Sequence, residues 1–138
     1  MATAVSTDCS PDRSTELSSA TNALQWRQIG DYYELRKRKC QRVHSKKGKY
    51  FDLGLFYKDG KFYAMTAWCS HMGGPLYNGE IEDYNGSAHI MCPWHGYMFD
   101  LETGKNEIGI RQDVHPVKVE KGQLYIQYET ELSLHPFL

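Results

Sequence analysis

The sequence carries two short motifs that each place one cysteine and one histidine among glycine and proline residues. The first reads CSHMGGP and begins at Cys69, with its histidine at His71; the second reads CPWHG and begins at Cys92, with its histidine at His95. Thiolate and imidazole are ligands that zinc and iron favour in proteins. We therefore predict that the chain folds with two tight loops, which together can supply four metal ligands.

Two kinds of metal centre use such ligands. A structural zinc ion usually takes two cysteines from one short loop and two histidines from a helix. Here each motif supplies one cysteine and one histidine, and twenty residues lie between His71 and Cys92. The mixed pairing favours a 2Fe–2S cluster, in which both cysteines bind one iron and both histidines bind the other. A single zinc ion remains the alternative.

Hairpin signals precede both motifs. The segment GLFYKDGKFYAMTAW has aromatic-rich runs on either side of Asp59-Gly60, and IEDYNGSAHIMC has runs on either side of Asn85-Gly86. Both dipeptides suit the positive φ angles of a two-residue type I′ turn. The sequence therefore predicts a hairpin before each motif, so that Cys69 and Cys92 each follow a strand.

The rest of the chain from Leu24 onwards also has the pattern of strands. In VKVEKGQLYIQYE, the apolar residues Val117, Val119, Leu124 and Ile126 alternate with polar ones, which predicts a third hairpin. Short runs separated by turn residues are typical of an all-β domain, and no segment has the pattern of a three-turn helix. The predicted fold class is therefore all-β.

The domain organisation follows from composition. Residues 1–22, which include Cys9, are rich in Ser, Thr, Ala and acids and lack apolar periodicity, so we predict a flexible tail. The length suits one domain, predicted over residues 23–129 with a cluster-binding part at about 66–104. Residues 130–138 are predicted to form a C-terminal tail that packs or frays.

Hydropathy and cysteine usage indicate the compartment. No apolar run approaches the length of a membrane span, and the first residues are polar and acidic where a secretory signal needs an apolar core. A cytoplasmic protein without membrane association is therefore expected. In that compartment Cys9, Cys40, Cys69 and Cys92 are expected to be free thiols or metal ligands rather than disulfides.

Positive charge is concentrated in one segment. Eight of the 16 Lys and Arg residues lie between Arg36 and Lys49, with no acid among them, although the net charge is only -1. We interpret the segment as a solvated sheet edge that discourages aggregation, with a docking patch for an acidic partner as the alternative. Nucleic-acid binding is not expected, because no recognition fold accompanies the patch. The basic neighbours predict a lowered thiol pKa for Cys40, with redox sensing as a minor alternative.

The two motifs, embedded as CSHMGGPL and CPWHGYMFDLETGK, resemble the Rieske family and, within it, the soluble Rieske-type ferredoxins, including the free-standing Rieske-domain proteins of vertebrates. The resemblance covers roughly residues 24–128. It implies an antiparallel β-sandwich with a small cluster-binding subdomain of two loops. It also implies one 2Fe–2S cluster, with Cys69 and Cys92 on the buried iron and His71 and His95 on the outer iron.

The departures from the family pattern concern the surroundings of the cluster. Respiratory members carry an extra cysteine in each loop, joined by a disulfide, where this chain has Gly73 or Gly74 and Trp94. They also carry a serine and a tyrosine that donate hydrogen bonds to sulfur, where this chain has Tyr97 and Phe99. Hydrogen bonds to sulfur raise the reduction potential and nearby negative charge opposes reduction, so we predict a potential of about -150 mV. The acids near the loops are Glu80, Glu82, Asp83, Asp100 and Glu102.

The function implied by the resemblance is one-electron transfer. Such a protein is a carrier rather than an enzyme with its own substrate site. It takes electrons from a flavoprotein reductase and passes them to an oxygenase or another redox acceptor. These contacts are expected to be transient and the carrier monomeric. The alternatives are a regulatory or electron-transfer subunit of a larger oxidoreductase, and an interaction module held together by zinc.

Overall fold

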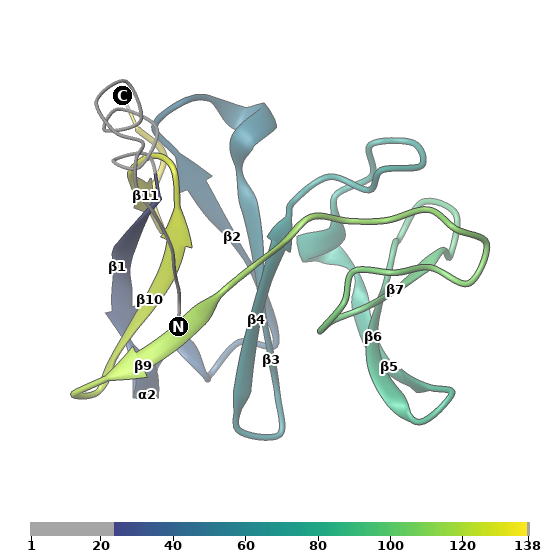
Figure 1. The fold of residues 1–138 in the computed structure, drawn as a ribbon, viewed down its shortest axis with the longest axis horizontal. Helices are drawn as coiled ribbons and strands as arrows, with labels where there is room; N and C mark the ends of the chain where they lie inside the picture. The colour runs from purple at the N-terminus through teal and green to yellow at the C-terminus, as the bar shows by residue number, and fades with distance from the viewer. Residues whose placement is uncertain (1–23, 138) are drawn as a thin grey trace, which may run out of the picture.

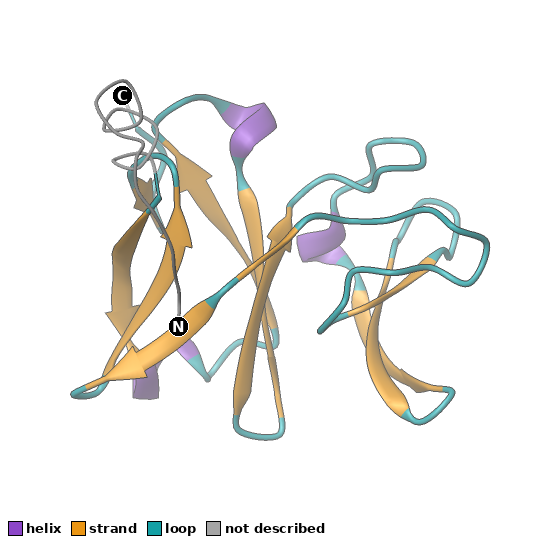
Figure 2. Cartoon of the chain, in the orientation of Figure 1, coloured by secondary structure: helices purple, strands orange, loops and turns teal. Residues whose placement is uncertain are grey.

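The computed structural model describes residues 24–137, and strands dominate this part of the chain (Figure 1, Figure 2). Its helical segments are the four-residue α2 (Tyr32–Leu35) and two single turns, η1 (Lys49–Phe51) and η2 (Leu76–Asn78). The predicted all-β fold class is confirmed. The predicted N-terminal tail, including Cys9, lies outside the described residues.

Three antiparallel sheets make up the fold. The first sheet has the order β1 (Gln25–Asp31), β10 (Gln123–Tyr128) and β9 (Val117–Glu120). The second has the order β11 (Leu132–Ser133), β2 (Cys40–Ser45), β3 (Leu53–Lys58), β4 (Lys61–Thr66) and β8 (Val114–His115). The third has the order β5 (Glu80–Tyr84), β6 (Ser87–Met91) and β7 (Met98–Asp100). In Figure 1 the second sheet stands between the other two.

The second sheet is buried on both faces. Leu55 of β3 faces a first core shared with the first sheet, whereas the next residue, Phe56, faces a second core shared with the third sheet. Ala64 and Met65 of β4 divide in the same way. Successive side chains of a strand point to opposite faces, which explains why these strands have continuous apolar runs instead of strict alternation.

The two cores differ in content. The first core contains Leu35, Val43, Leu53, Leu55, Phe62, Ala64, Leu124, Ile126, Tyr128 and Leu132. The second contains Phe56, Met65, Cys69, Leu76, Ile90, Cys92, Phe99 and Leu101. The first and second sheets, packed around the first core, form a sandwich. Both cysteines of the sequence motifs lie in the second core, between this sandwich and the third sheet.

The predicted hairpins are present with the predicted turns. Asp59-Gly60 and Asn85-Gly86 join β3 to β4 and β5 to β6, and all four residues have φ between 50° and 85°. Lys121-Gly122 joins β9 to β10 in the same way, with φ angles of 52° and 78°. One expected inward residue differs, because Val119 is 47% exposed on β9, which lies at the edge of its sheet.

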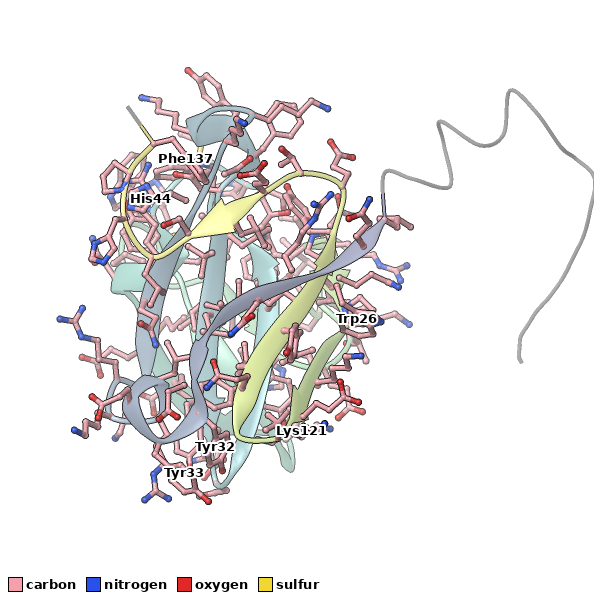
Figure 3. The ribbon with its side chains drawn as sticks, turned by 90° about the vertical axis from the view of Figure 1, so that its left-hand side faces the viewer. Trp26, Tyr32, Tyr33, His44, Lys121 and Phe137 are labelled. Atoms are coloured by element: carbon pink, nitrogen blue, oxygen red, sulfur yellow. The ribbon has the colours of Figure 1, made fainter. Side chains whose placement is uncertain are left out.

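Most basic residues between Arg36 and Lys49 are exposed, but the end of β2 within this segment is paired rather than free. Strand β11 pairs with β2, with Leu132 opposite Ser45. Residues 130–138 are predicted to form a tail that packs or frays, and the described part of them contains β11, which pairs with His44 and Ser45 at the end of β2. In Figure 3, His44 and Phe137 lie at one end of the molecule, while Tyr32, Tyr33 and Lys121 lie at the other.

Two lysines of the basic segment are paired with acids that precede β11. The Lys47 Nζ atom lies 2.7 Å from the Glu129 carboxylate, and the Lys46 Nζ atom lies 3.5 Å from that of Glu131. These exposed pairs contribute little to stability, since exposed ion pairs are typically worth about 0.2–1 kcal/mol. They do reduce the net positive charge that this surface presents.

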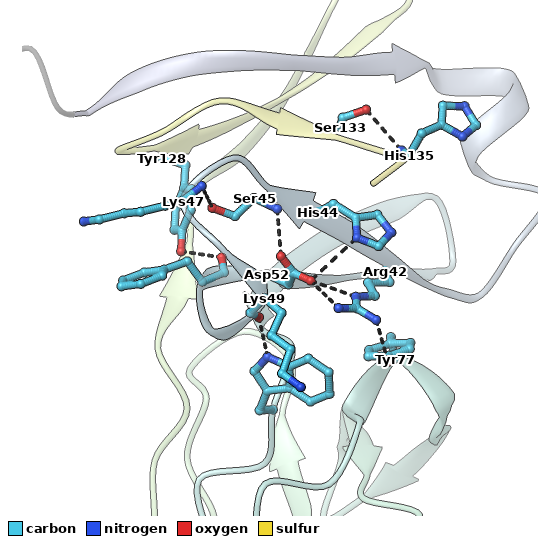
Figure 4. Close-up of polar contacts among 12 residues, drawn as sticks. Arg42, His44, Ser45, Lys47, Lys49, Asp52, Tyr77, Tyr128, Ser133 and His135 are labelled. Atoms are coloured by element: carbon cyan, nitrogen blue, oxygen red, sulfur yellow. Dashed lines mark hydrogen bonds and ion pairs between the residues drawn. The ribbon is translucent and has the colours of Figure 1, made fainter. Parts of the chain in front are cut away.

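The buried residue Asp52 links β2 to the chain just before the first motif, and Figure 4 shows its side-chain contacts. Asp52, which is 1% exposed, accepts hydrogen bonds from Arg42 Nε at 2.8 Å and from the Ser45 N–H at 2.7 Å. Its backbone oxygen accepts a hydrogen bond from the Ala67 N–H at 3.0 Å. Ala67 lies two residues before Cys69, so Asp52 ties β2 and β3 to the start of that loop.

Arg42 extends this connection to the third sheet. Its guanidinium carbon lies 5.1 Å from the Trp68 ring centre and 5.3 Å from that of Tyr77. Its Nη1 atom also donates to the Tyr77 hydroxyl at 3.2 Å. Tyr77 belongs to η2, which leads into β5. The charge of Arg42 is thus held between Asp52 and two aromatic rings.

Candidate metal centre

Both sequence motifs form loops at the ends of strands, as predicted. Cys69 follows β4 after two intervening residues, and Cys92 directly follows β6. The second loop ends at β7, whose first residue is Met98, and the first loop leads into η2. The two loops therefore enter the site from different sheets, β4 of the sandwich and β6 of the third sheet.

The two loops have the same backbone hydrogen bonds. The Cys69 N–H donates to the carbonyl five residues later, Gly74, at 2.7 Å, and the Gly73 N–H donates back to the Cys69 carbonyl at 2.7 Å. In the second loop the Cys92 N–H donates to the Tyr97 carbonyl at 2.8 Å, and the Gly96 N–H donates back to the Cys92 carbonyl at 2.9 Å.

The matching glycines explain part of the sequence pattern. Gly73 and Gly96 occupy equivalent positions, four residues after their cysteines, and have φ angles of 79° and 74°. Residues with a Cβ rarely adopt this left-handed conformation, so glycine is favoured at both positions. Each cysteine is thereby held at the start of a closed, locally determined turn.

The thiols and the imidazoles are separated by depth. Cys69 is 3% exposed and Cys92 is 1% exposed, whereas His71 and His95 are both exposed. The two imidazole ring centres lie 5.5 Å apart, with the ring planes at 88°. The structure thus places the two thiols near each other in the core and the two imidazole rings near each other at the surface.

The first thiol is in an environment that opposes ionisation. Burial raises the pKa of the Cys69 thiol, the nearby Cys92 thiol raises it further, and the backbone N–H groups of His71 and Met72 oppose the rise. Two adjacent thiolates would repel each other in an apolar core. A bound metal removes both penalties, because its positive charge favours the deprotonated ligands and releases their protons.

The close approach of the loops fits a compact inorganic group. A Cβ atom added to Gly74 would lie 2.7 Å from the Cys92 Sγ atom and 3.1 Å from the Trp94 ring. Glycine therefore leaves space beside the thiol that any other residue would fill. Two ligand pairs fit a 2Fe–2S cluster, because each iron needs two protein ligands besides two bridging sulfides. Within residues 24–137, no three His, Cys, Asp or Glu side chains are grouped to hold one ion.

Two aromatic side chains border the outer pair. Tyr97 packs its ring against His71, with ring centres 4.1 Å apart. Trp94 and Met72, which are next in sequence to His95 and His71, are 58% and 57% exposed. The motif spacing did not predict the contact between Tyr97 and His71, because it joins side chains from different loops.

Three other described histidines have contacts elsewhere in the fold. His44 lies 3.7 Å from the Asp52 carboxylate, and the His89 Nδ1 atom lies 3.1 Å from the Ser87 carbonyl oxygen. Burial lowers the pKa of His115, whose ring packs on Tyr128. Each of these rings therefore has a local structural partner.

The predicted lowering of the Cys40 thiol pKa is wrong. Burial, followed by the negative charge of Glu80, raises the pKa of Cys40 to about 11, while Lys39 opposes the rise. The Cys40 Sγ atom points to the Gly79 carbonyl oxygen at 3.7 Å. The basic residues adjacent in sequence are mostly exposed to solvent, which weakens their effect on the thiol.

Comparison with known proteins agrees with this arrangement. A family model described as "Soluble Rieske-type ferredoxin" matches residues 28–108. A Rieske domain-containing protein of Homo sapiens is 36% identical, and the match covers 56% of this chain and 60% of that protein. The ferredoxin subunit of a 3-phenylpropionate/cinnamic acid dioxygenase from Photorhabdus laumondii is also 36% identical, with 58% of this chain and 76% of that protein covered.

A solved structure has the same fold. The ferredoxin of Sphingomonas yanoikuyae B1 superposes with a TM-score of 0.55 at 25% identity, covering 76% of this chain and 97% of that chain. The family match includes both loops and extends over more than half of the sequence. On this evidence, the chain belongs to the family of soluble Rieske-type ferredoxins.

Proposed function

We propose that the protein is a one-electron carrier that holds one 2Fe–2S cluster through Cys69, Cys92, His71 and His95. The observation that carries the proposal is the separation of two buried thiols from two exposed imidazoles whose ring centres lie 5.5 Å apart. When bound, such a cluster accepts and returns a single electron. The thiols hold the inner side of the site in an apolar core, and the imidazoles form its only solvent-facing ligands.

The surface around the imidazoles suits brief contacts with partner proteins. Met72 and Trp94, which are 57% and 58% exposed, offer apolar area next to His71 and His95. Small, partly apolar contact areas are typical of weak redox encounters. We propose a flavoprotein reductase as donor and an oxygenase-like protein as acceptor, since relatives of this chain are dioxygenase ferredoxin subunits.

The remaining features of the proposal follow from the carrier role. The protein acts as a monomer in the cytoplasm, binds neither nucleic acid nor membranes, and catalyses no reaction on a substrate of its own. No helix in the described part of the chain is long and apolar enough to cross a bilayer. Four protein ligands complete the coordination of a 2Fe–2S cluster, so no position is left for a substrate.

The direct test is the metal content of anaerobically purified protein. We expect two irons and two acid-labile sulfides per chain, and an electron paramagnetic resonance signal of a histidine-ligated cluster after reduction with dithionite. Iron, sulfide and zinc are measured on the same sample. A colourless protein with one zinc per chain would replace the electron carrier with a zinc-held interaction module.

Phe99 tests how the surroundings set the reduction potential. Phe99 is fully buried in the same core as both cysteines, at the position where respiratory relatives carry a tyrosine donor. Phe99→Tyr should raise the midpoint potential by roughly 40 mV, which corresponds to a hydrogen bond to sulfur about 1 kcal/mol stronger in the reduced state. A spectroscopic redox titration measures the shift.

The matched control for this substitution is Phe62→Tyr. Phe62 is 6% exposed and lies in the first core, away from the cysteines. The Phe62→Tyr substitution introduces the same hydroxyl and should leave the midpoint potential unchanged. Equal potentials for wild-type protein and Phe99→Tyr would show that the missing tyrosine does not set the potential.

A further inference from the structure

A buried glutamine joins the return segment of the chain to the first loop. Gln112 lies in the long connection from β7 to β8, seen in green in Figure 1, and its side chain is only 2% exposed. Gln112 is 43 residues away in sequence from Cys69. Neither motif includes Gln112, and its type and spacing gave no signal of a role.

The Gln112 amide makes three hydrogen bonds to one short stretch of backbone. Its Oε1 atom accepts from the Ser70 N–H at 2.6 Å, and its Nε2 atom donates to the Trp68 carbonyl at 3.0 Å and to the Thr66 carbonyl at 3.2 Å. A reversed amide would place donor against donor and acceptor against acceptor, so its orientation is fixed. The bonds lie on both sides of Cys69.

The backbone of Gln112 is tied to the end of β7, the strand that follows the other loop. The Gln112 N–H donates to the Gly104 carbonyl at 2.8 Å, and the Gly104 N–H donates to the Asp100 carbonyl at 2.7 Å. Asp100 ends β7, the strand that leaves the second loop. A Cβ atom on Gly104 would collide with the Gln112 carbonyl oxygen, so glycine is required for this approach.

These contacts form one continuous path between the two halves of the site. The path runs from β7 through Gly104 and Gln112 to Ser70, the residue between Cys69 and His71. The self-closed turns fix each loop internally but do not fix one loop relative to the other. The side chain of Gln112 supplies a polar connection from the β7 side to the Cys69–His71 loop.

We infer that Gln112 is a positioning residue that sets the Cys69–His71 loop relative to the Cys92–His95 loop. The inference rests on the proposed function, because its purpose is to keep the two ligand pairs at the separation that a cluster requires. Its substitution should therefore change how tightly iron is held and the spectrum of the reduced protein. A purely structural role would lower thermal stability alone.

The experiment compares Gln112→Met with wild-type protein, both carrying iron. Methionine preserves length and approximate volume but removes all three hydrogen bonds. We expect iron to be lost to a chelator at least tenfold faster, because a tenfold change corresponds to about 1.4 kcal/mol and each of the three lost bonds is typically worth about 1 kcal/mol. We also expect a shifted or broadened paramagnetic resonance signal after reduction.

The matched control is Gln41→Met. Gln41 is partly buried, and its side chain donates to the Leu35 carbonyl at 3.2 Å. Gln41 pairs with Leu55 across β2 and β3, on the side of the first core. The Gln41→Met substitution also removes a hydrogen bond from a side chain to a backbone carbonyl, but away from the proposed metal site. We expect its melting temperature to fall while its iron-loss rate and spectrum match those of wild-type protein.

A conservative variant keeps the test valid if Gln112→Met does not fold. At pH 6, burial should keep the introduced carboxyl of Gln112→Glu protonated, so that one oxygen accepts from Ser70 and the hydroxyl donates to one carbonyl. Its iron-loss rate should lie within roughly threefold of wild-type protein, with the original signal. Gln112→Asn, whose amide is one methylene shorter, should lose iron as fast as Gln112→Met.

The outcomes separate the two levels of inference. Wild-type protein with two irons, and a Gln112→Met variant that behaves like Gln41→Met, would overturn the positioning role and leave the carrier intact. If Gln112→Met does not fold, Gln112→Asn takes its place. Equal iron-loss rates and equal paramagnetic resonance signals in Gln112→Asn and wild-type protein would then overturn the positioning role. Wild-type protein without a cluster would overturn the proposed function itself.

Discussion

Cys69→Ser protein, expressed with an iron supply and purified anaerobically, is expected to contain less than about a tenth of the wild-type iron and sulfide and to be colourless. Cys69 is one of two adjacent thiols in the second core, where burial and the neighbouring Cys92 thiol raise its pKa. A serine hydroxyl in the same position deprotonates far less readily and is a harder ligand than a thiolate. Removing one ligand should therefore release both irons.

Cys40→Ser provides the matched control for this loss. Cys40 is also partly buried, but its thiol faces the Gly79 carbonyl rather than another thiol. The substitution removes a cysteine without touching the four proposed ligands, and iron content should stay at two per chain. Full iron in Cys69→Ser, or equal loss in both variants, would show that the ligand assignment is wrong.

Asp52→Ala is expected to lower the free energy of unfolding by about 3 kcal/mol, and the melting temperature by roughly 10 °C. The substitution leaves Arg42 without its carboxylate and the Ser45 N–H without its acceptor. Arg42 is partly exposed, with 27% of its side chain accessible, so the loss falls at the lower end of the range for buried ion pairs. Thermal unfolding followed by circular dichroism measures the change.

Asp83→Ala serves as the comparison for Asp52→Ala. Asp83 pairs with Lys58 at 3.7 Å, but its side chain is 75% exposed. Because solvent screens such a pair, its loss should change stability by no more than about 0.5 kcal/mol. Similar melting temperatures for the two variants would mean that burial of the Asp52 network contributes little.

Local sequence determined much of what could be predicted. The turns at Asp59-Gly60 and Asn85-Gly86 depend only on the φ angles that those residues tolerate, and the structure has them where expected. The placement of Cys69 and Cys92 after strands follows from those hairpins. The loops themselves close through hydrogen bonds between residues no more than five apart, so their form is also a local property.

The features that escaped prediction all depend on contacts between distant segments. Gln112 meets the first loop only because β8 pairs with β4, and the sequence between them gives no sign of the meeting. The raised pKa of Cys40 depends on burial and on Glu80, forty residues later. Neighbours in sequence suggested the opposite shift, because burial depends on the tertiary fold.

The pairing of β4 with β8 also bears on how such a protein can be re-engineered and how it could diversify. Ala64 faces His115 and Met65 faces Val114, so the whole segment from 67 to 113 leaves the sandwich and returns to it at adjacent strands. An insertion with neighbouring ends can be exchanged as one unit without altering the register of the host sheet. The first two sheets can therefore serve as a common scaffold, and chimeras joined within β4 and β8 can exchange the segment from 67 to 113, which includes Gln112.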